Sequence, residues 1–339
     1  MHSIVSLLKN WTLPVAIILG TTLYLVFAFV PQLEDAAVTL GEVIAVIFPM
    51  SVFATLFITF SKVDFHLMGL RRWHLVVVLL QLMLAGFVTL LILLYTEYVD
   101  PERKSFFCVA LALLTCVIAP CASASPVVTA KLGGNLTEMT SFVLLSSIVT
   151  AVAIPAVFPL VSPSPGFSFL ATFFRILEKM AIVLLLPLLL GVIVRMGAHY
   201  KIRPFIGIYN YIIASPDLAF YCWAFSLAIT AGVTVRNIVH SEAPLTLLVV
   251  IAVLSFLVAL VQFAIGRAVG HRLGVPIEGG QAMFQKNTAL AIWVSTLYLP
   301  PVASVGAGCY VLWQNIINSY ELWAARSPNR KSSNRQIVN

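Results

Sequence analysis

Two apolar stretches of the chain are interrupted by small polar residues and prolines. The first stretch, 106–130, contains the run Ala119-Pro120-Cys121-Ala122-Ser123-Ala124-Ser125-Pro126. The second, 279–300, contains the run Phe284-Gln285-Lys286-Asn287-Thr288-Ala289. Interrupted helices in equivalent places of two halves of a membrane protein are typical of a transporter's binding site. Freed backbone N–H and C=O groups at such breaks can bind ions and charged groups.

Lys286 is the only basic residue near the middle of an apolar stretch, and no carboxylate stands at a matching depth. A lysine at the bilayer centre costs about 2.5–3.5 kcal/mol on insertion scales. We expect its ammonium to serve a substrate or ion site. The alternative is that it reaches an interface or only satisfies loose carbonyls. The flanking Gln285, Asn287 and Thr288 can coordinate a cation, hydrogen-bond a carboxylate, or satisfy their own backbone.

In the first interruption, Pro120 and Pro126 each remove a backbone donor, and Ser123 and Ser125 lie between them. A helix that restarts there exposes N–H groups and the positive end of its dipole, which favours an anion. The alternative is a simple proline kink with serines that face neighbouring helices. Two prolines around small polar residues favour a true interruption.

Other polar residues stand inside apolar stretches. The last stretch places four of them on one helical face, which should look inward: Gln314, Asn315, Asn318 and Ser319. Gln81 and Gln262 each precede an interrupted stretch. Hydrogen bonds between helices explain such residues as well as substrate contact does.

The composition indicates that the bilayer is the solvent. Of 339 residues, 60% are apolar and 10% are charged, whereas soluble domains carry about 25% charged residues. Membrane spans need about 20 mostly apolar residues each. Ten are predicted: 11–30, 37–60, 73–96, 105–130, 137–161, 175–195, 210–233, 243–268, 279–299 and 302–324.

The basic residues predict the orientation. Most lysines and arginines outside the spans fall on one side, so both termini are expected to be cytoplasmic. The net charge of +7 is therefore a topology signal, and no nucleic-acid partner is expected. The N-terminus has no small-residue cleavage site, so no removable signal is expected. The five cysteines form no CxxC pair, and no catalytic or metal motif is present, so an enzyme is not expected.

Ten spans divide into two sets of five, and an odd number per set means that the second set is inverted. The predicted fold is an all-α membrane protein with ten transmembrane helices in two inverted five-helix repeats. The predicted repeats are residues 1–163 and 167–325, followed by a cytoplasmic basic tail at 326–339.

Several groups of residues resemble the bile acid:sodium symporter family. Asp64-Phe65, followed by Gln81, is similar to its second-to-third-span region. Lys179-Met180, leading into Leu186-Pro187-Leu188-Leu189-Leu190-Gly191, is similar to its sixth span. The last part of the chain is similar to three family motifs in the same order. Asn287-Thr288-Ala289-Leu290-Ala291 is similar to the family's Asn-Ser-Gly-Leu-Ala, and Pro301-Val302-Ala303 is similar to its Pro-Val. Trp313-Gln314-Asn315-Ile316-Ile317-Asn318-Ser319 is similar to its Trp-His-Asn-Ile-x-x-Ser. The chain is identified as a divergent, bacterial-type member.

The resemblance implies a panel domain of spans 1, 2, 6 and 7 and a core domain of spans 3, 4, 5, 8, 9 and 10. Discontinuous helices 4 and 9 cross in the core, the substrate sits between panel and core, and two sodium ions normally sit behind the crossing. The expected substrate-binding residues are Ser123, Ser125, Asn287, Thr288, Gln314 and Asn315. The expected ligands of a cation or its surrogate are Lys286, Gln285, Gln81 and Thr129.

The chain departs from the family at both crossovers. The first normally reads Gly-Gly-Thr-Ala-Ser-Asn, but Ser123-Ala124-Ser125-Pro126 stands there. The second normally reads Glu-Val-Gly-Met-Gln-Asn; anchoring on Asn287 places Ala282 at the glutamate and Lys286 at the glutamine. A one-residue insertion returns the glutamine to Gln285 but supplies no glutamate.

Two unit charges about 4 Å apart repel by roughly 4 kcal/mol at an effective dielectric constant of 20. The hypothesis is that Lys286 replaces a sodium ion, so that transport is sodium-independent or coupled to Lys286 protonation.

The sequence thus predicts a secondary active transporter of organic anions, of the bile-acid or small-carboxylate class, in a bacterial inner membrane. It would work by alternating access, with Na⁺ or H⁺ as the only candidate coupling ions and no other cofactor. Its expected partners are the substrate and the lipid bilayer, with no obligate protein partner. The alternative is a membrane-embedded ligand sensor that does not transport.

Overall fold

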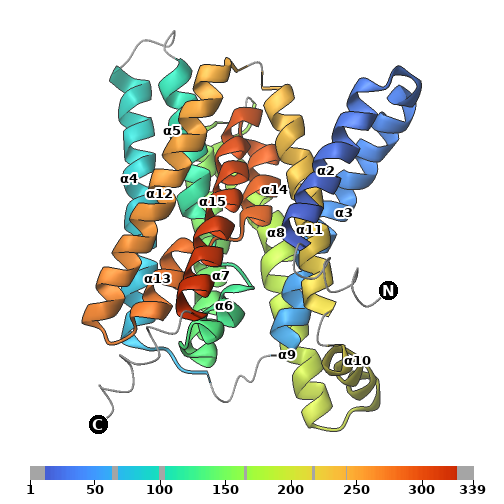
Figure 1. The fold of residues 1–339 in the computed structure, drawn as a ribbon, viewed down its shortest axis with the longest axis vertical. Helices are drawn as coiled ribbons and strands as arrows, with labels where there is room; N and C mark the ends of the chain where they lie inside the picture. Colours follow the sequence, from blue (N-terminus) through green and yellow to red (C-terminus); the bar gives the residue numbers. More distant parts are fainter. Residues whose placement is uncertain are drawn as a thin grey trace.

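The computed structural model describes residues 12–62, 68–98, 104–163, 166–215, 218–241 and 243–326. These residues fold almost entirely into helices (Figure 1), as the sequence predicts. The Asp64-Phe65 pair and the basic tail beyond Arg326 lie outside the described residues. The first half contains α2 (Thr12–Phe29), η1 (Pro31–Leu33), α3 (Glu34–Ser61), α4 (Arg72–Tyr98), α5 (Lys104–Ile118), α6 (Ser125–Lys131) and α7 (Leu136–Val161). The second contains α8 (Phe169–Met180), η3 (Ala181–Leu185), α9 (Leu186–His199), α10 (Arg203–Ala214), α11 (Leu218–Val239), α12 (Leu245–Arg272), α13 (Pro276–Phe284), α14 (Thr288–Tyr298) and α15 (Pro301–Arg326).

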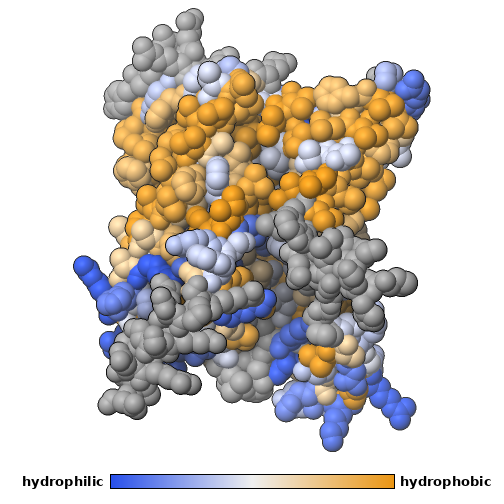
Figure 2. Space-filling view, viewed as in Figure 1, coloured by the Kyte–Doolittle hydropathy of each residue, from blue (hydrophilic) through white to orange (hydrophobic). Residues whose placement is uncertain are grey.

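The helices are those of an integral, multi-pass membrane protein. Six described segments are long and apolar enough to cross a bilayer: Asp35–Ser61, Arg72–Thr96, Leu136–Val161, Phe169–His199, Tyr221–Val239 and Leu245–Arg272. Three shorter apolar helices accompany them: Val15–Phe29, Ser105–Ile118 and Thr288–Tyr298. Apolar side chains cover most of the upper part of the face in Figure 2, and polar ones gather toward its lower end. The count of ten spans and their inverted repeat stay predictions.

Two helix boundaries differ from the predicted ones, each for a local reason. The predicted stretch 210–233 begins inside α10, which ends at Ala214, and most of it lies in α11. Ser215-Pro216-Asp217 separates the two helices in the sequence, and a proline disfavours helical backbone in the residue before it. The predicted stretch 175–195 contains the π-helical turn η3. Pro187 follows this turn, and its ring and missing N–H disturb the preceding turn of a helix.

Helices from both halves of the chain lie side by side in two groups (Figure 1). The crossing group contains α4, α5, α6, α7, α12, α13, α14 and α15, and the flanking group contains α2, α3, α9, α10 and α11. The α8–η3 segment connects the groups, because α8 contacts α7 and η3 contacts both α7 and α3. Glycines bring helices of the crossing group very close together. A Cβ at Gly306 of α15 would clash with the backbone of Ala112 in α5, and one at Gly279 of α13 would clash with Gly266 of α12.

Candidate functional site

The two interrupted helices meet each other at their breaks. α5 ends at Ile118 and α6 begins at Ser125, whereas α13 ends at Phe284 and α14 begins at Thr288. The Ala122 N–H donates to the Gln285 carbonyl at 3.0 Å, and the Asn287 N–H donates to the Pro120 carbonyl at 2.8 Å. These bonds form a short antiparallel bridge that pairs Cys121 with Lys286. We call this place the crossing. The predicted interruptions are therefore present, and four helix ends converge there.

Ser125 and Gln285 join the two interruptions through their side chains. The Ser125 hydroxyl donates to Gln285 Oε1 at 2.8 Å and accepts from the Cys121 thiol at 3.2 Å. Gln285 Nε2 donates to Asn318 Oδ1 at 3.0 Å and to Gln281 Oε1. Both N–H groups and the oxygen of the Gln285 amide are thus occupied. All five side chains are buried, so this network holds α6, α13 and α15 together.

Polar residues of α15 face the crossing in a line that differs from the predicted face. Gln314 and Asn318 are buried, and Gln314 Oε1 accepts from the Lys286 N–H at 2.7 Å. Asn315 is half-buried and donates to the Val311 carbonyl of its own helix at 2.6 Å, while Ser319 is exposed. The line continues at the partly buried Glu321, because steps of four and three residues return to the same helical face.

Asn287 and Thr288 occupy the start of α14. Asn287 Oδ1 accepts from the Leu290 N–H at 3.2 Å and so caps this helix. The sequence leaves three roles open for Asn287, and in the structure its side-chain oxygen satisfies a backbone N–H group of its own helix. Thr288 is buried, and Ser123 in the first interruption is half-buried. Ser123 therefore stands at the crossing without full enclosure.

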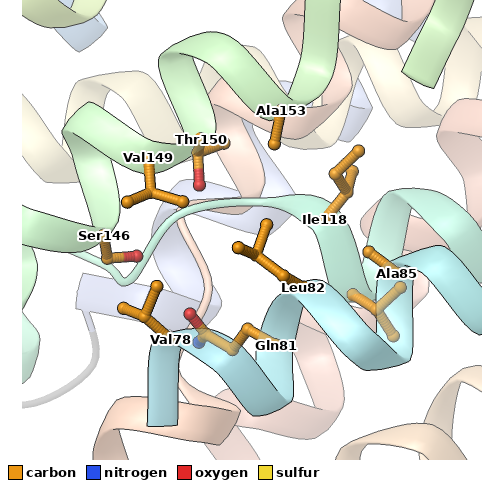
Figure 3. A pocket seen from close by; sticks show the side chains of 10 residues that line it. Val78, Gln81, Leu82, Ala85, Ile118, Ser146, Val149, Thr150 and Ala153 are labelled. Carbon is orange, nitrogen blue, oxygen red and sulfur yellow. The ribbon is translucent and has the colours of Figure 1, made fainter. Parts of the chain in front are cut away.

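Gln81 and α7 flank the first interruption on opposite sides (Figure 3). Gln81 Nε2 donates to the Ala282 carbonyl of α13 at 3.0 Å. Ser146 of α7 accepts from the Cys121 N–H at 2.9 Å. Together with Thr150, Gln81 and Ser146 are the polar lining of a small cavity of about 10 Å³, which is close to the room needed by one water molecule.

The Lys286 side chain is buried without a polar partner in the part of the chain that the structure describes. It is only 1% exposed, yet its Nζ has no hydrogen-bond partner among the described residues. An unpaired buried ammonium is costly, and an unpaired buried amine still costs a few kcal/mol. Thr129 Oγ1 and Gln262 Oε1 are also buried without a partner in that part of the chain. The helices α5 and α13 point their carboxyl ends at the crossing, where the helix dipole favours a positive charge.

Several residues of this network were not among the predicted site residues. Cys121, Gln281, Asn318 and Glu321 all contact it. Glu321 lies near the end of the last predicted span, so its depth alone did not single it out. Its spacing of seven residues from Gln314 is the signal that could have found it, because that spacing places both on one face.

An all-helical membrane protein with two interrupted helices that cross in its interior has the architecture of a secondary transporter. The sequence model of the Sodium Bile acid symporter family matches residues 71–268. Since this range covers more than half of the chain, the chain belongs to that family of transporters. A comparison with curated proteins finds no match. The matched range runs from the start of α4 into α12, so Lys286 and the second interruption lie beyond it.

The family implies sodium; side-chain amide oxygens at the crossing already accept one hydrogen bond each, whereas Thr129 Oγ1 of α6 has no partner among the described residues. Bound sodium needs carbonyl and other oxygen atoms that point at it. Gln285 Oε1 already accepts from the Ser125 hydroxyl. The side-chain oxygens of Asn287 and Gln314 each accept from a backbone N–H group. The carboxylate that joins the network, on Glu321, is paired with Arg267. A protonated Lys286 would add repulsion of roughly 4 kcal/mol to a cation about 4 Å away.

Proposed function

We propose that the protein is a secondary transporter of small organic anions in which the Lys286 side chain takes the place of a coupling cation. The observation that carries this proposal is the buried Lys286 amine without a hydrogen-bond partner among the described residues. A buried amine without a hydrogen bond destabilises the fold, so a protein keeps such a residue where it serves function. Ionisable residues inside membranes mark substrate and ion pathways. The side-chain amide oxygens of Gln285, Asn287 and Gln314 already accept a hydrogen bond, and a protonated Lys286 would repel an arriving cation, which together support a resident amine.

The proposed mechanism is alternating access across ten spans in two inverted repeats, 1–163 and 167–325. The panel would consist of α2, α3, the α8–η3–α9 segment and α11. The core would consist of α4, α5–α6, α7, α12, α13–α14 and α15. In this arrangement the anion binds where the panel faces the crossing, near Ser123 and Thr288. Ser125, Gln285, Gln314 and Asn318 hold the crossing in shape.

The first test compares ligand binding in sodium chloride and in choline chloride. Purified protein is heated with cholate, taurocholate, pyruvate and other carboxylates, since a ligand of the folded state raises the melting temperature. We expect the temperature shift of each bound anion to be equal in the two salts. A shift that requires sodium, with Lys286 intact, contradicts the proposed role of this lysine. If the shift is equal, repeating it across pH shows whether a proton is bound together with the anion.

Uptake into vesicles separates a transporter from a sensor. The anion with the largest shift is labelled, and its accumulation is measured in vesicles that contain the purified protein. We expect accumulation that saturates with concentration and does not change when choline replaces sodium. Binding without accumulation would favour a membrane-embedded sensor of the same ligand.

A hydrogen-bonded contact between the proposed panel and core makes alternating access testable. Asn237 of α11 is buried, and its Nδ2 donates to Thr296 of α14 at 3.1 Å and to Ser304 of α15 at 2.6 Å. Both hydroxyls donate to carbonyls of their own helices, so they are held ready to accept. These bonds lie at the predicted outer end and must break if the two domains separate there.

We therefore expect Asn237→Leu to loosen the outer end. Loss of two hydrogen bonds at about 1 kcal/mol each predicts roughly tenfold or faster backbone hydrogen exchange in α14. The matched control is Asn210→Leu on α10, where the asparagine is exposed. Equal exchange in α14 for both variants would show that Asn237 does not restrain this end of the molecule.

A further inference from the structure

A salt bridge connects to the crossing from the far ends of α12 and α15. Arg267 of α12 places one guanidinium nitrogen 2.7 Å from each carboxylate oxygen of Glu321 on α15. The pair is partly buried, because the side chain of Glu321 is 14% exposed and that of Arg267 is 32% exposed. Glu321 Oε2 also accepts from Gln281 Nε2 at 3.3 Å. The salt bridge is thus one hydrogen bond away from the side chain that contacts Gln285.

The donor and the acceptor of each hydrogen bond from Glu321 through Gln281 to Gln285 follow from the carboxylate. A carboxylate only accepts hydrogen bonds, so the Gln281 amide must turn its NH₂ group toward Glu321. The oxygen of Gln281 is then left to accept from Gln285 Nε2. Gln285 in turn presents its own oxygen to the Ser125 hydroxyl. The acceptor-only group at one end therefore decides which way two buried amides point at the crossing.

We propose that the Arg267–Glu321 salt bridge is a positioning pair that sets the orientation of Gln281 and Gln285 and thereby holds the two interrupted helices together. Arg267 keeps the Glu321 carboxylate in place, since its nitrogen bonds both oxygens. A chain of amides transmits orientation but is a poor path for protons, because an amide nitrogen does not readily give up a proton. The pair acts on the geometry of the crossing and contacts neither substrate nor cation.

The test replaces the carboxylate with its neutral isostere. Glu321→Gln has nearly the same shape but offers an NH₂ group as well as an oxygen, so Gln281 can turn either way. Hydrogen exchange is measured on peptides covering 119–126 and 284–290, which include the N–H groups of Ala122 and Asn287. We expect exchange at these two amides to rise about tenfold, as for the loss of one hydrogen bond to a charged group. The readout needs no ligand and does not depend on the proposed transport.

Three further variants distinguish positioning from a general loss of stability. Glu321→Asp keeps an acceptor-only group and Arg267→Lys keeps a cation, so both are expected to stay within about threefold of wild-type exchange at the crossing. The matched control is Arg71→Met, which removes the salt bridge from Arg71 to Glu138, whose atoms lie 3.3 Å apart. Arg71 is 65% exposed, and its ion pair with Glu138 and its hydrogen bond to His74 are not part of the crossing network. Exchange there should not change.

The outcomes are separate from those of the proposed function. If Glu321→Gln leaves exchange at the crossing unchanged, or if Glu321→Asp raises it equally, the positioning role is overturned. Where exchange rises as expected, uptake of the anion identified above should show a several-fold higher KM for Glu321→Gln with little change for Arg71→Met. If exchange rises as expected in Glu321→Gln but the unmodified protein takes up no anion, the result counts against transport and not against positioning.

Discussion

Replacement of Lys286 by methionine is expected to stabilise the protein and to abolish its transport. Methionine has a similar length and no charge, so it removes the buried amine that has no partner among the described residues. Replacing buried ionic groups with apolar ones of similar volume is often neutral or stabilising by about 1–4 kcal/mol. Anion uptake should fall by more than about tenfold, because the charge that stands in for the cation is gone. Stability and activity therefore change in opposite directions.

The measurements are the melting temperature and uptake into vesicles, with Lys131→Met as the matched control. Lys131 lies in the last turn of α6, close to the crossing in sequence, but is exposed. Its replacement should change neither quantity appreciably. If Lys286→Met instead lowers the melting temperature while uptake persists, the lysine is a structural side chain and the proposed substitution for a cation is wrong.

Addition of a single methyl group at Gly279 is expected to displace the second interrupted helix. A Cβ there would clash with the carbonyl oxygen of Gly266 and lie 2.8 Å from the Cα of Gly270. Both neighbours are backbone atoms of α12, so no side chain can rotate away. Overpacking of this kind costs about 1–3 kcal/mol and sometimes more. We expect Gly279→Ala to lower the melting temperature and to remove the ligand-induced shift, because α13 carries Gln281 and ends beside Gln285.

Gly86→Ala is the matched control for this prediction. Gly86 also lies inside a long apolar helix, α4, but a Cβ there would meet nothing within 4 Å. Alanine is the better helix former by about 0.5–1 kcal/mol, so this variant should be neutral or slightly more stable. If the two alanine variants melt alike, the close approach of α12 and α13 does not limit the fold.

The sequence predicted both interruptions, but only the first has a local cause. Pro120 and Pro126 remove backbone donors wherever the chain lies. Glutamine and lysine are good helix formers, so at Gln285 and Lys286 the backbone bonds to Pro120 and Ala122 of the other interruption hold the break open. The bilayer environment followed from composition. The predicted span 210–233 ran across the boundary between α10 and α11, although Pro216 and Asp217 stand there in the sequence, because the apolar residues on both sides dominate a hydropathy window.

The sequence by itself determined that this is an all-helical membrane protein of the symporter family with two interrupted helices, because hydropathy, proline geometry and motif order are properties of neighbouring residues. Only the tertiary structure decided which side chains meet there. Ser125 and Gln285 are 160 residues apart, and Arg267 and Glu321 are 54 apart. It also left the Lys286 amine without a hydrogen bond among the described residues. Hydrogen bonds act over about 3 Å, so the packing of helices in space, not spacing along the chain, selects each partner.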